Sequence, residues 1–115
     1  MQKELRLVES RRYSAIYQDG LGWANNFLVL RTLPNERPGP RFGLVTARRV
    51  GNAVTRNKVR RRLKELLRAT RIKPGWDLVF IVRRRATMLD YRQLQFAAWD
   101  LLKKANLLEC YRTER

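Results

Sequence analysis

The sequence contains no histidine and only one cysteine, Cys110. A single cysteine cannot form an intrachain disulfide, and the absence of histidine excludes the usual Cys/His zinc sites. Apolar runs such as Leu78–Val82 are far shorter than the roughly 20 residues of a membrane-spanning helix, and the N-terminus lacks an apolar signal segment. These absences predict a reduced, cytoplasmic protein that does not insert into membranes.

Acidic residues are also scarce. Only 10 Asp and Glu stand against 26 Lys and Arg, which gives a net charge of +16 over 115 residues. This charge exceeds what solubility requires and indicates a polyanionic partner such as a nucleic acid. The few carboxylates are scattered without a paired acidic motif, so a two-metal nuclease site in the protein is disfavoured but stays open, as does direct metal binding.

The hydrophobic content of 44% is sufficient for one core, so we expect a single domain over residues 1–115. Ser10 can cap a helix that continues to about Gln18. Strands are predicted over residues 26–32 and 41–48, and Leu78–Val82 is typical of a strand covered on both faces.

Two longer helices follow from apolar periodicity. One stripe predicts a helix over about 55–70, and it consists of Val59, Leu63, Leu66 and Leu67. Asp90 and Gln93 have the spacing of a capping box at the start of the last helix. The order is therefore helix, two or three strands, helix, strand, helix. This order describes an α/β (α+β) two-layer sandwich with a mixed sheet of about four strands, αβββαβα.

Charge is densest between residues 47 and 68, where nine basic residues are offset by Glu65 alone. A solvated helix face normally mixes both signs at i, i+4 spacing, so this alternative is disfavoured. Arginine can bridge two phosphate oxygens, and a helix N-terminus adds backbone donors and partial positive charge. The candidate binding residues are Arg48, Arg49, Asn52, Arg56, Asn57, Lys58, Arg60, Arg61, Lys64 and Arg68.

Aromatic residues form a second candidate surface. Tyr13 and Tyr17 are four residues apart on one helical face and could stack on unpaired bases, although core packing beside Ile16 is the alternative. Phe27 and Arg31 fall on one face of the first predicted strand. They would extend this surface, with Arg31 as a phosphate partner.

The basic segment carries a recognisable signature. Arg48–Val54 (RRVGNAV) and Arg56–Leu63 (RNKVRRRL) resemble the motif of the bacterial ribonuclease P protein family. Arg6-Leu7, Gly43 and Asp77–Arg83 fall in the family's order, so the resemblance covers nearly the whole chain. Lys58 stands in place of the motif's second Arg, which keeps the charge but loses the guanidinium fork. Val45 and Ala47 replace frequent small hydroxyl residues, and Arg31 replaces a frequent aromatic.

The resemblance implies a left-handed βαβ crossover, an exception to the usual rule. It also implies a noncatalytic subunit that binds the catalytic ribonuclease P RNA and the 5′ leader of precursor tRNA. The RNA would use magnesium to release the mature 5′ end, with no catalytic residue in the protein. Tyr13, Tyr17, Phe27 and Arg31 would bind the leader. No membrane and no obligate protein partner are expected. A ribosomal or general structured-RNA-binding protein is the alternative.

Overall fold

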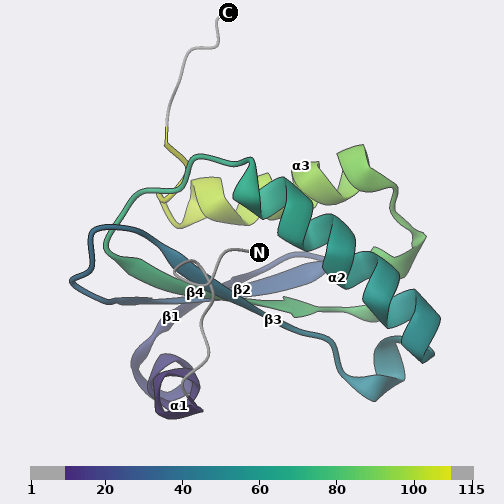
Figure 1. The fold of residues 1–115 in the computed structure, drawn as a ribbon, viewed down its shortest axis with the longest axis horizontal. Helices are drawn as coiled ribbons and strands as arrows, with labels where there is room; N and C mark the ends of the chain where they lie inside the picture. The colour runs from purple at the N-terminus through teal and green to yellow at the C-terminus, as the bar shows by residue number, and fades with distance from the viewer. Residues whose placement is uncertain (1–9, 110–115) are drawn as a thin grey trace, which may run out of the picture.

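The computed structural model describes residues 10–109, so Arg6, Leu7 and Cys110 lie outside the described residues (Figure 1). The elements are α1 (Ser10–Asp19), β1 (Leu21–Ala24), β2 (Leu28–Pro34), β3 (Arg41–Val45), α2 (Ala53–Arg68), β4 (Trp76–Val82) and α3 (Tyr91–Lys104). Short 3-10 helices, η2 (Arg48–Val50) and η3 (Arg84–Met88), precede α2 and α3. The predicted order αβββαβα is confirmed.

The four strands form one mixed sheet in the order β1-β2-β4-β3. β3 and β4 are parallel neighbours, whereas β1 with β2 and β2 with β4 are antiparallel. β3, α2 and β4 therefore make a βαβ unit, and the handedness of its crossover stays a prediction. β3 ends at Val45 instead of about Arg48, because the chain turns into η2 and buries Val50.

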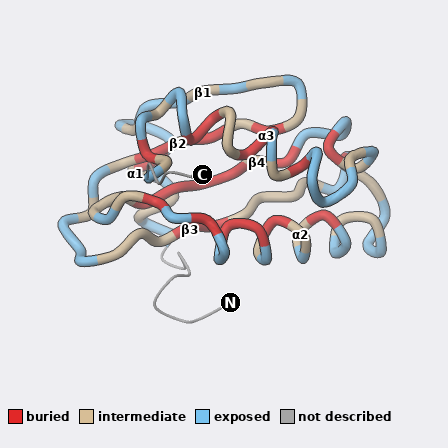
Figure 2. The backbone as a smooth tube through the Cα atoms, turned by 90° about the horizontal axis from the view of Figure 1, so that it is seen from above, coloured by how far each residue is buried: buried red, intermediate tan, exposed pale blue. Residues whose placement is uncertain are grey.

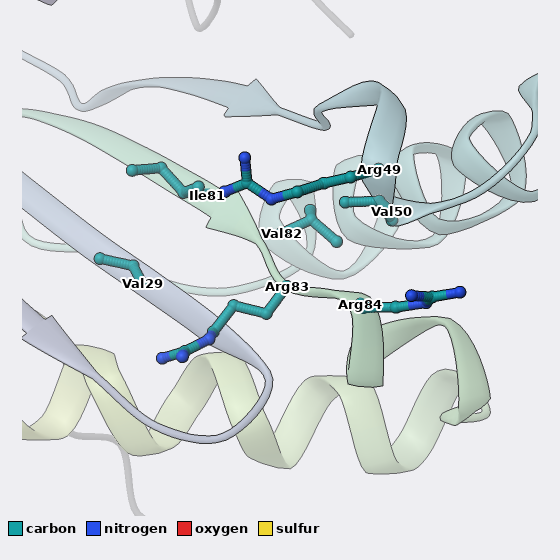
Figure 3. A pocket seen from close by; sticks show the side chains of 7 residues that line it. All are labelled: Val29, Arg49, Val50, Ile81, Val82, Arg83 and Arg84. Atoms are coloured by element: carbon teal, nitrogen blue, oxygen red, sulfur yellow. The ribbon is translucent and has the colours of Figure 1, made fainter.

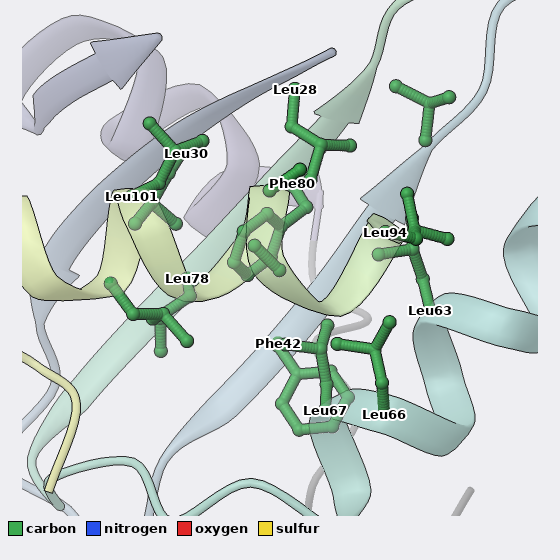
Figure 4. Packing of buried hydrophobic residues seen from close by; sticks show 14 of the residues in the cluster. Leu28, Leu30, Phe42, Leu63, Leu66, Leu67, Leu78, Phe80, Leu94 and Leu101 are labelled. Carbon is green, nitrogen blue, oxygen red and sulfur yellow. The ribbon is translucent and has the colours of Figure 1, made fainter. Parts of the chain in front are cut away.

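The helices lie on both sides of the sheet: α2 and α3 cover one face, and α1 lies against the other (Figure 1). The main core fills the space between the sheet and α2 and α3 (Figure 4). Strand residues Leu30, Phe42 and Phe80 meet Leu67 of α2 and Leu101 of α3 there. Figure 2 shows the result along α2, where buried and exposed positions alternate with the turns of the helix.

Side-chain caps fix the starts of the two long helices. The Asn52 carboxamide oxygen accepts the Thr55 backbone N–H at 2.9 Å, which explains why α2 begins at Ala53, two residues before the predicted start. Asp90 accepts the Gln93 N–H at 2.8 Å, and Gln93 in turn accepts the Asp90 N–H at 3.0 Å. The predicted capping box is confirmed.

Candidate RNA interface

The outer side of η2 and α2 carries the predicted binding residues. Arg48, Arg49, Asn52, Asn57, Lys58, Arg61 and Arg68 are exposed, and Arg56, Arg60 and Lys64 are partly buried. Within residues 10–109, no ion pair includes a basic residue of the segment 47–68. We call this segment the basic surface. Within the described residues its charge is therefore not neutralised by ion pairs and is available to a polyanion.

Local contacts hold part of the basic surface in place. Arg60 donates to the Thr46 hydroxyl and, at 3.5 Å, to the Asn57 carboxamide oxygen. Arg62, which sequence reasoning did not select, donates to the Leu89 carbonyl at 2.9 Å and joins α2 to η3. Arg56 has a buried Nε without a hydrogen-bond partner, the kind of unsatisfied donor that a phosphate oxygen would satisfy.

The opposite face of the sheet, against which α1 lies, is built from three cross-strand rows. Because directly paired residues point to the same side, each row presents three side chains or glycines together. The rows are Leu33, Asp77 and Arg41; then Arg31, Val79 and Gly43; then Val29, Ile81 and Val45. The first two rows contact α1, and Val29 and Ile81 of the third row line an open hollow.

Asp77 anchors the start of α1 in the first row. Its buried carboxylate accepts from Arg12 Nε at 2.8 Å, Arg41 Nε and Nη2 at 2.9 Å each, and Asn35 Nδ2 at 2.7 Å. Burial alone would raise the pKa of Asp77, but the hydrogen bonds from Arg41, Asn35 and Arg12 outweigh it and lower the pKa below its ordinary value. Sequence reasoning missed this cluster, because no pattern connects Arg12 with a residue 65 positions later.

The second row receives the aromatic face of α1. A Cβ at Gly43 would collide with the Tyr13 hydroxyl and ring, so glycine at this position lets Tyr13 lie on the sheet. Burial, with a smaller contribution from nearby Tyr17, raises the pKa of Tyr13. Ile16 is fully buried beside Val79. Tyr13 is therefore a packing residue between α1 and the sheet, with its hydroxyl over Gly43.

Arg31, in the same row, closes the C-terminal end of α1. Its guanidinium donates to the carbonyls of Ile16 at 3.3 Å, Tyr17 at 2.9 Å and Gly20 at 3.1 Å. These contacts fix the backbone at Tyr17, whose side chain is 43% exposed. Arg31 is thus already bound to backbone oxygens in this structure, where sequence reasoning expected a phosphate partner.

Phe27 does not join the other predicted aromatic residues. The chain turns sharply before β2 because Asn25 Oδ1 accepts the N–H groups of both Phe27 and Leu28, each at 2.9 Å. Phe27 consequently lies outside β2 and packs against the main core, on the α3 side. The structure brings Tyr13, Tyr17 and Arg31 together and separates Phe27 from them.

Val29 and Ile81 of the third row line a hollow of about 440 Å³, which we call the cleft. Val29 and Ile81 supply apolar side chains, and Arg49 from η2 and Arg83 after β4 extend toward them (Figure 3). Arg84 of η3 also lines the hollow, although its side chain extends in the opposite direction (Figure 3). Arg49 extends toward Ile81, so the basic surface and the cleft meet at this residue (Figure 3). Sequence reasoning overlooked Arg83 and Arg84, although the run Arg83–Arg85 directly after a buried strand was a visible signal.

In the part of the chain from 10 to 109, no group of three or more Cys, Asp or Glu side chains is arranged to hold a metal ion. None of the helices described in this range has the length and apolar character needed to cross a membrane.

A mixed α+β fold, an uncompensated basic helix and an apolar cleft bordered by arginines define the class as RNA-binding. The family model described as Ribonuclease P matches residues 1–106, and the chain belongs to this family. It is 39% identical to the ribonuclease P protein component of Roseiflexus sp. (strain RS-1), over 95% of this chain and 92% of that protein.

Solved structures agree with this assignment. A Staphylococcus aureus RNase P protein mutant with defective mRNA degradation activity superposes with a TM-score of 0.85 at 28% identity, over 92% of both chains. The RNase P protein from Thermotoga maritima gives 0.79 at 28% identity, over 86% of this chain and 96% of that one. These relationships are those of a ribonuclease P subunit in tRNA processing.

Proposed function

We infer that the protein binds the catalytic ribonuclease P RNA through the basic surface and the 5′ leader of precursor tRNA through the cleft and α1. The supporting observation is the junction at Arg49, where uncompensated positive charge continues into an apolar hollow. A structured RNA and an unpaired strand that leaves it need two such adjoining surfaces. The protein would hold both and so raise the affinity of the complex for precursor over mature tRNA.

The basic surface suits the backbone of a folded RNA. Exposed guanidinium groups on η2 and α2 can bind phosphates over several turns, and the N-terminal end of α2 adds partial positive charge with no acidic residue in its first turn. Arg56 contributes a donor that the protein leaves unsatisfied. Because such contacts involve phosphates, shape and position would matter more than sequence.

The cleft and α1 suit an unpaired strand. Tyr17 offers an exposed ring on which a base can stack, Val29 and Ile81 provide apolar contact, and Arg83 and Arg84 are placed to bind the strand's phosphates. A duplex would gain little here, because its bases are already stacked on one another. The leader, which is single-stranded next to the cleavage site, is therefore the proposed ligand.

In this proposal the protein has no catalytic residue. The RNA subunit would use magnesium ions to hydrolyse the phosphodiester bond, and the protein would position the substrate. Asp77, the fully buried carboxylate, is already held by Arg12, Arg41 and Asn35 and is engaged in holding α1. Protein freed of RNA should leave precursor tRNA intact in the presence of magnesium.

The test is reconstitution. The protein, a bacterial ribonuclease P RNA and precursor tRNA would be combined at low magnesium, and 5′ processing followed by gel. We expect strong stimulation by the protein, which the double variant Arg56→Ala, Arg60→Ala should weaken. The matched control is Arg92→Ala, Lys103→Ala, which removes the same charge from exposed positions on α3. No stimulation by the unaltered protein would refute the proposed function.

A further inference from the structure

A second surface, outside the predicted site, continues from the cleft toward α3. Arg83, Arg84 and Arg85 are exposed and, with Asn26, line a hollow of about 420 Å³. Arg83 also donates to the Asn25 carbonyl at 3.2 Å. This hollow shares Arg83 and Arg84 with the cleft. A strand that lies in the cleft can therefore pass along the arginines without leaving the surface of the protein.

The path continues into a third hollow, of about 410 Å³, because Asn26 lines both. Here Phe27, Leu89 and Phe96 supply most of the apolar contact. Phe96 is 62% exposed, whereas phenylalanine side chains are usually buried. We call Phe27, Leu89 and Phe96 the aromatic shelf.

Hydrogen bonds fix the turn that carries Phe27 to α3. Asn25 accepts the Phe27 and Leu28 N–H groups with its oxygen and donates with its nitrogen to the Ala97 carbonyl at 3.0 Å and to Asp100 at 3.1 Å. One side chain thus fixes the β1–β2 turn to α3. A surface ordered before binding loses less conformational entropy when a ligand arrives.

Charge identifies the kind of ligand. Among the described residues, Asp100 is the one carboxylate that lines these hollows, and it is paired with Lys104 at 3.3 Å. Three arginines beside an exposed phenylalanine match the alternating phosphates and bases of unpaired RNA. A second copy of this chain would bring the arginines of two highly basic molecules together, which disfavours it as the occupant.

We propose that Arg85 and Phe96 form an additional binding site for one or two unpaired RNA nucleotides, reached by a strand that continues from the cleft past Arg83 and Arg84. The phosphates bind the arginines and a base stacks on Phe96. The proposal rests on the proposed function for the identity of the strand, a precursor tRNA leader. Leaders too short to span from the cleft to the shelf do not reach the site.

The experiment compares leader lengths in the reconstituted complex. Precursor tRNAs with leaders of increasing length are titrated against complexes that contain the unaltered protein, Phe96→Ala or Arg85→Ala. For the unaltered protein, we expect the affinity for precursor tRNA to rise with leader length. In Phe96→Ala this increase in affinity should be smaller by about fivefold or more, while the affinity for precursors with short leaders is unchanged. Arg85→Ala should also make the salt dependence shallower by about 0.7 in log-log slope.

Two control variants separate this site from general surface effects. Met88 is 83% exposed but lies outside the shelf hollow, so Met88→Ala removes apolar surface without touching the site. Arg92→Ala removes one exposed charge from α3. Both should keep the full gain with leader length. Thermal melting confirms that each variant is folded, which is expected because the altered side chains are exposed.

The outcomes are distinct. The proposal is overturned if precursor affinity rises equally with leader length for Phe96→Ala and the unaltered protein. It is also overturned if Phe96→Ala changes the oligomeric state in sedimentation, because a second copy of the chain would then be the occupant. The protein alone is also titrated with oligouridylates of four and ten nucleotides, where Phe96→Ala should weaken the ten-mer selectively. If Phe96→Ala weakens the four-mer and the ten-mer equally, or neither, the site is overturned. If Phe96→Ala weakens only the ten-mer but leader length has no effect on precursor binding, the site binds RNA and the assignment to the leader is refuted.

Discussion

Arg31→Met should release the C-terminal end of α1 and thereby weaken leader binding. Arg31 donates to the carbonyls of Ile16, Tyr17 and Gly20, which are the last carbonyls of the helix and the turn after it. Hydrogen bonds from a charged donor contribute about 1.5–3 kcal/mol when shielded from water, and a cation at a helix C-terminus adds to this. Since Arg31 is only partly buried, we take about 2 kcal/mol for the whole set.

For a domain of this size, 2 kcal/mol corresponds to a decrease in Tm of about 8 °C. The matched control is Arg11→Met, which removes an exposed arginine from the same helix and should leave Tm nearly unchanged. In the complex, Arg31→Met should lower the affinity for precursor tRNA, because Tyr17 loses its fixed position. Affinity for the catalytic RNA should stay the same. Arg31→Lys should give an intermediate result, since an ammonium group lacks the fork that reaches three carbonyls.

A direct phosphate contact by Arg31 is the competing explanation. That contact would leave Tm unchanged in Arg31→Met and make the salt dependence of precursor binding shallower by about 0.7 in log-log slope. Unchanged Tm together with this change in slope would refute the positioning role. A lower Tm with an unchanged slope would support it.

Three further results are expected. In Arg56→Ala, Arg60→Ala, affinity for the catalytic RNA should fall and its salt dependence should become shallower by roughly 0.7–0.9 per lost phosphate contact; a folded variant with unchanged affinity and slope would contradict the role of the basic surface. Tyr17→Ala should weaken precursor binding roughly fivefold or more while mature tRNA is hardly affected, and Tyr17→Phe should retain most affinity if stacking dominates; equal losses for both RNAs would exclude a leader-specific role. Because the folded pKa of Asp77 lies below its ordinary value of 3.8, its contribution to stability is complete above that pH and is lost as pH falls through the folded pKa. The free energy of unfolding, measured from pH 7 to pH 2, should therefore be higher for the unaltered protein than for Asp77→Asn at neutral pH, and the difference should narrow in acid; a constant difference would contradict the assignment. Processing by the Asp77→Asn complex should be reduced but not abolished.

Periodicity and caps were sufficient to predict the long helices. The apolar stripe of Val59, Leu63, Leu66 and Leu67 is buried as expected, and the capping box at Asp90 and Gln93 is present. These features depend on residues close in sequence, so local patterns contain the necessary information. The basic surface was predictable for the same reason, since its residues come from one segment.

The α1 side of the sheet was less predictable. β1 is short and mostly exposed, so it has no alternation to detect. Phe27 was expected on the same strand face as Arg31, but the Asn25 side chain turns the chain before β2 begins. The contacts of Arg12 with Asp77 and of Arg31 with α1 join residues far apart in sequence. Such contacts depend on strand register, which the sequence pattern does not specify.

The way α1 is attached has a consequence for local unfolding. Ile16 is the only fully buried residue of α1, whereas α2 and α3 bury nine residues in the main core. The rest of the attachment consists of polar contacts to Asp77 and from Arg31 at the two ends of the helix. Hydrogen exchange in α1 should therefore be faster than in β4 and α2, because a segment with few buried contacts opens at a lower free energy. On warming, the capacity to hold a leader would disappear first, and the capacity to bind the catalytic RNA would outlast it.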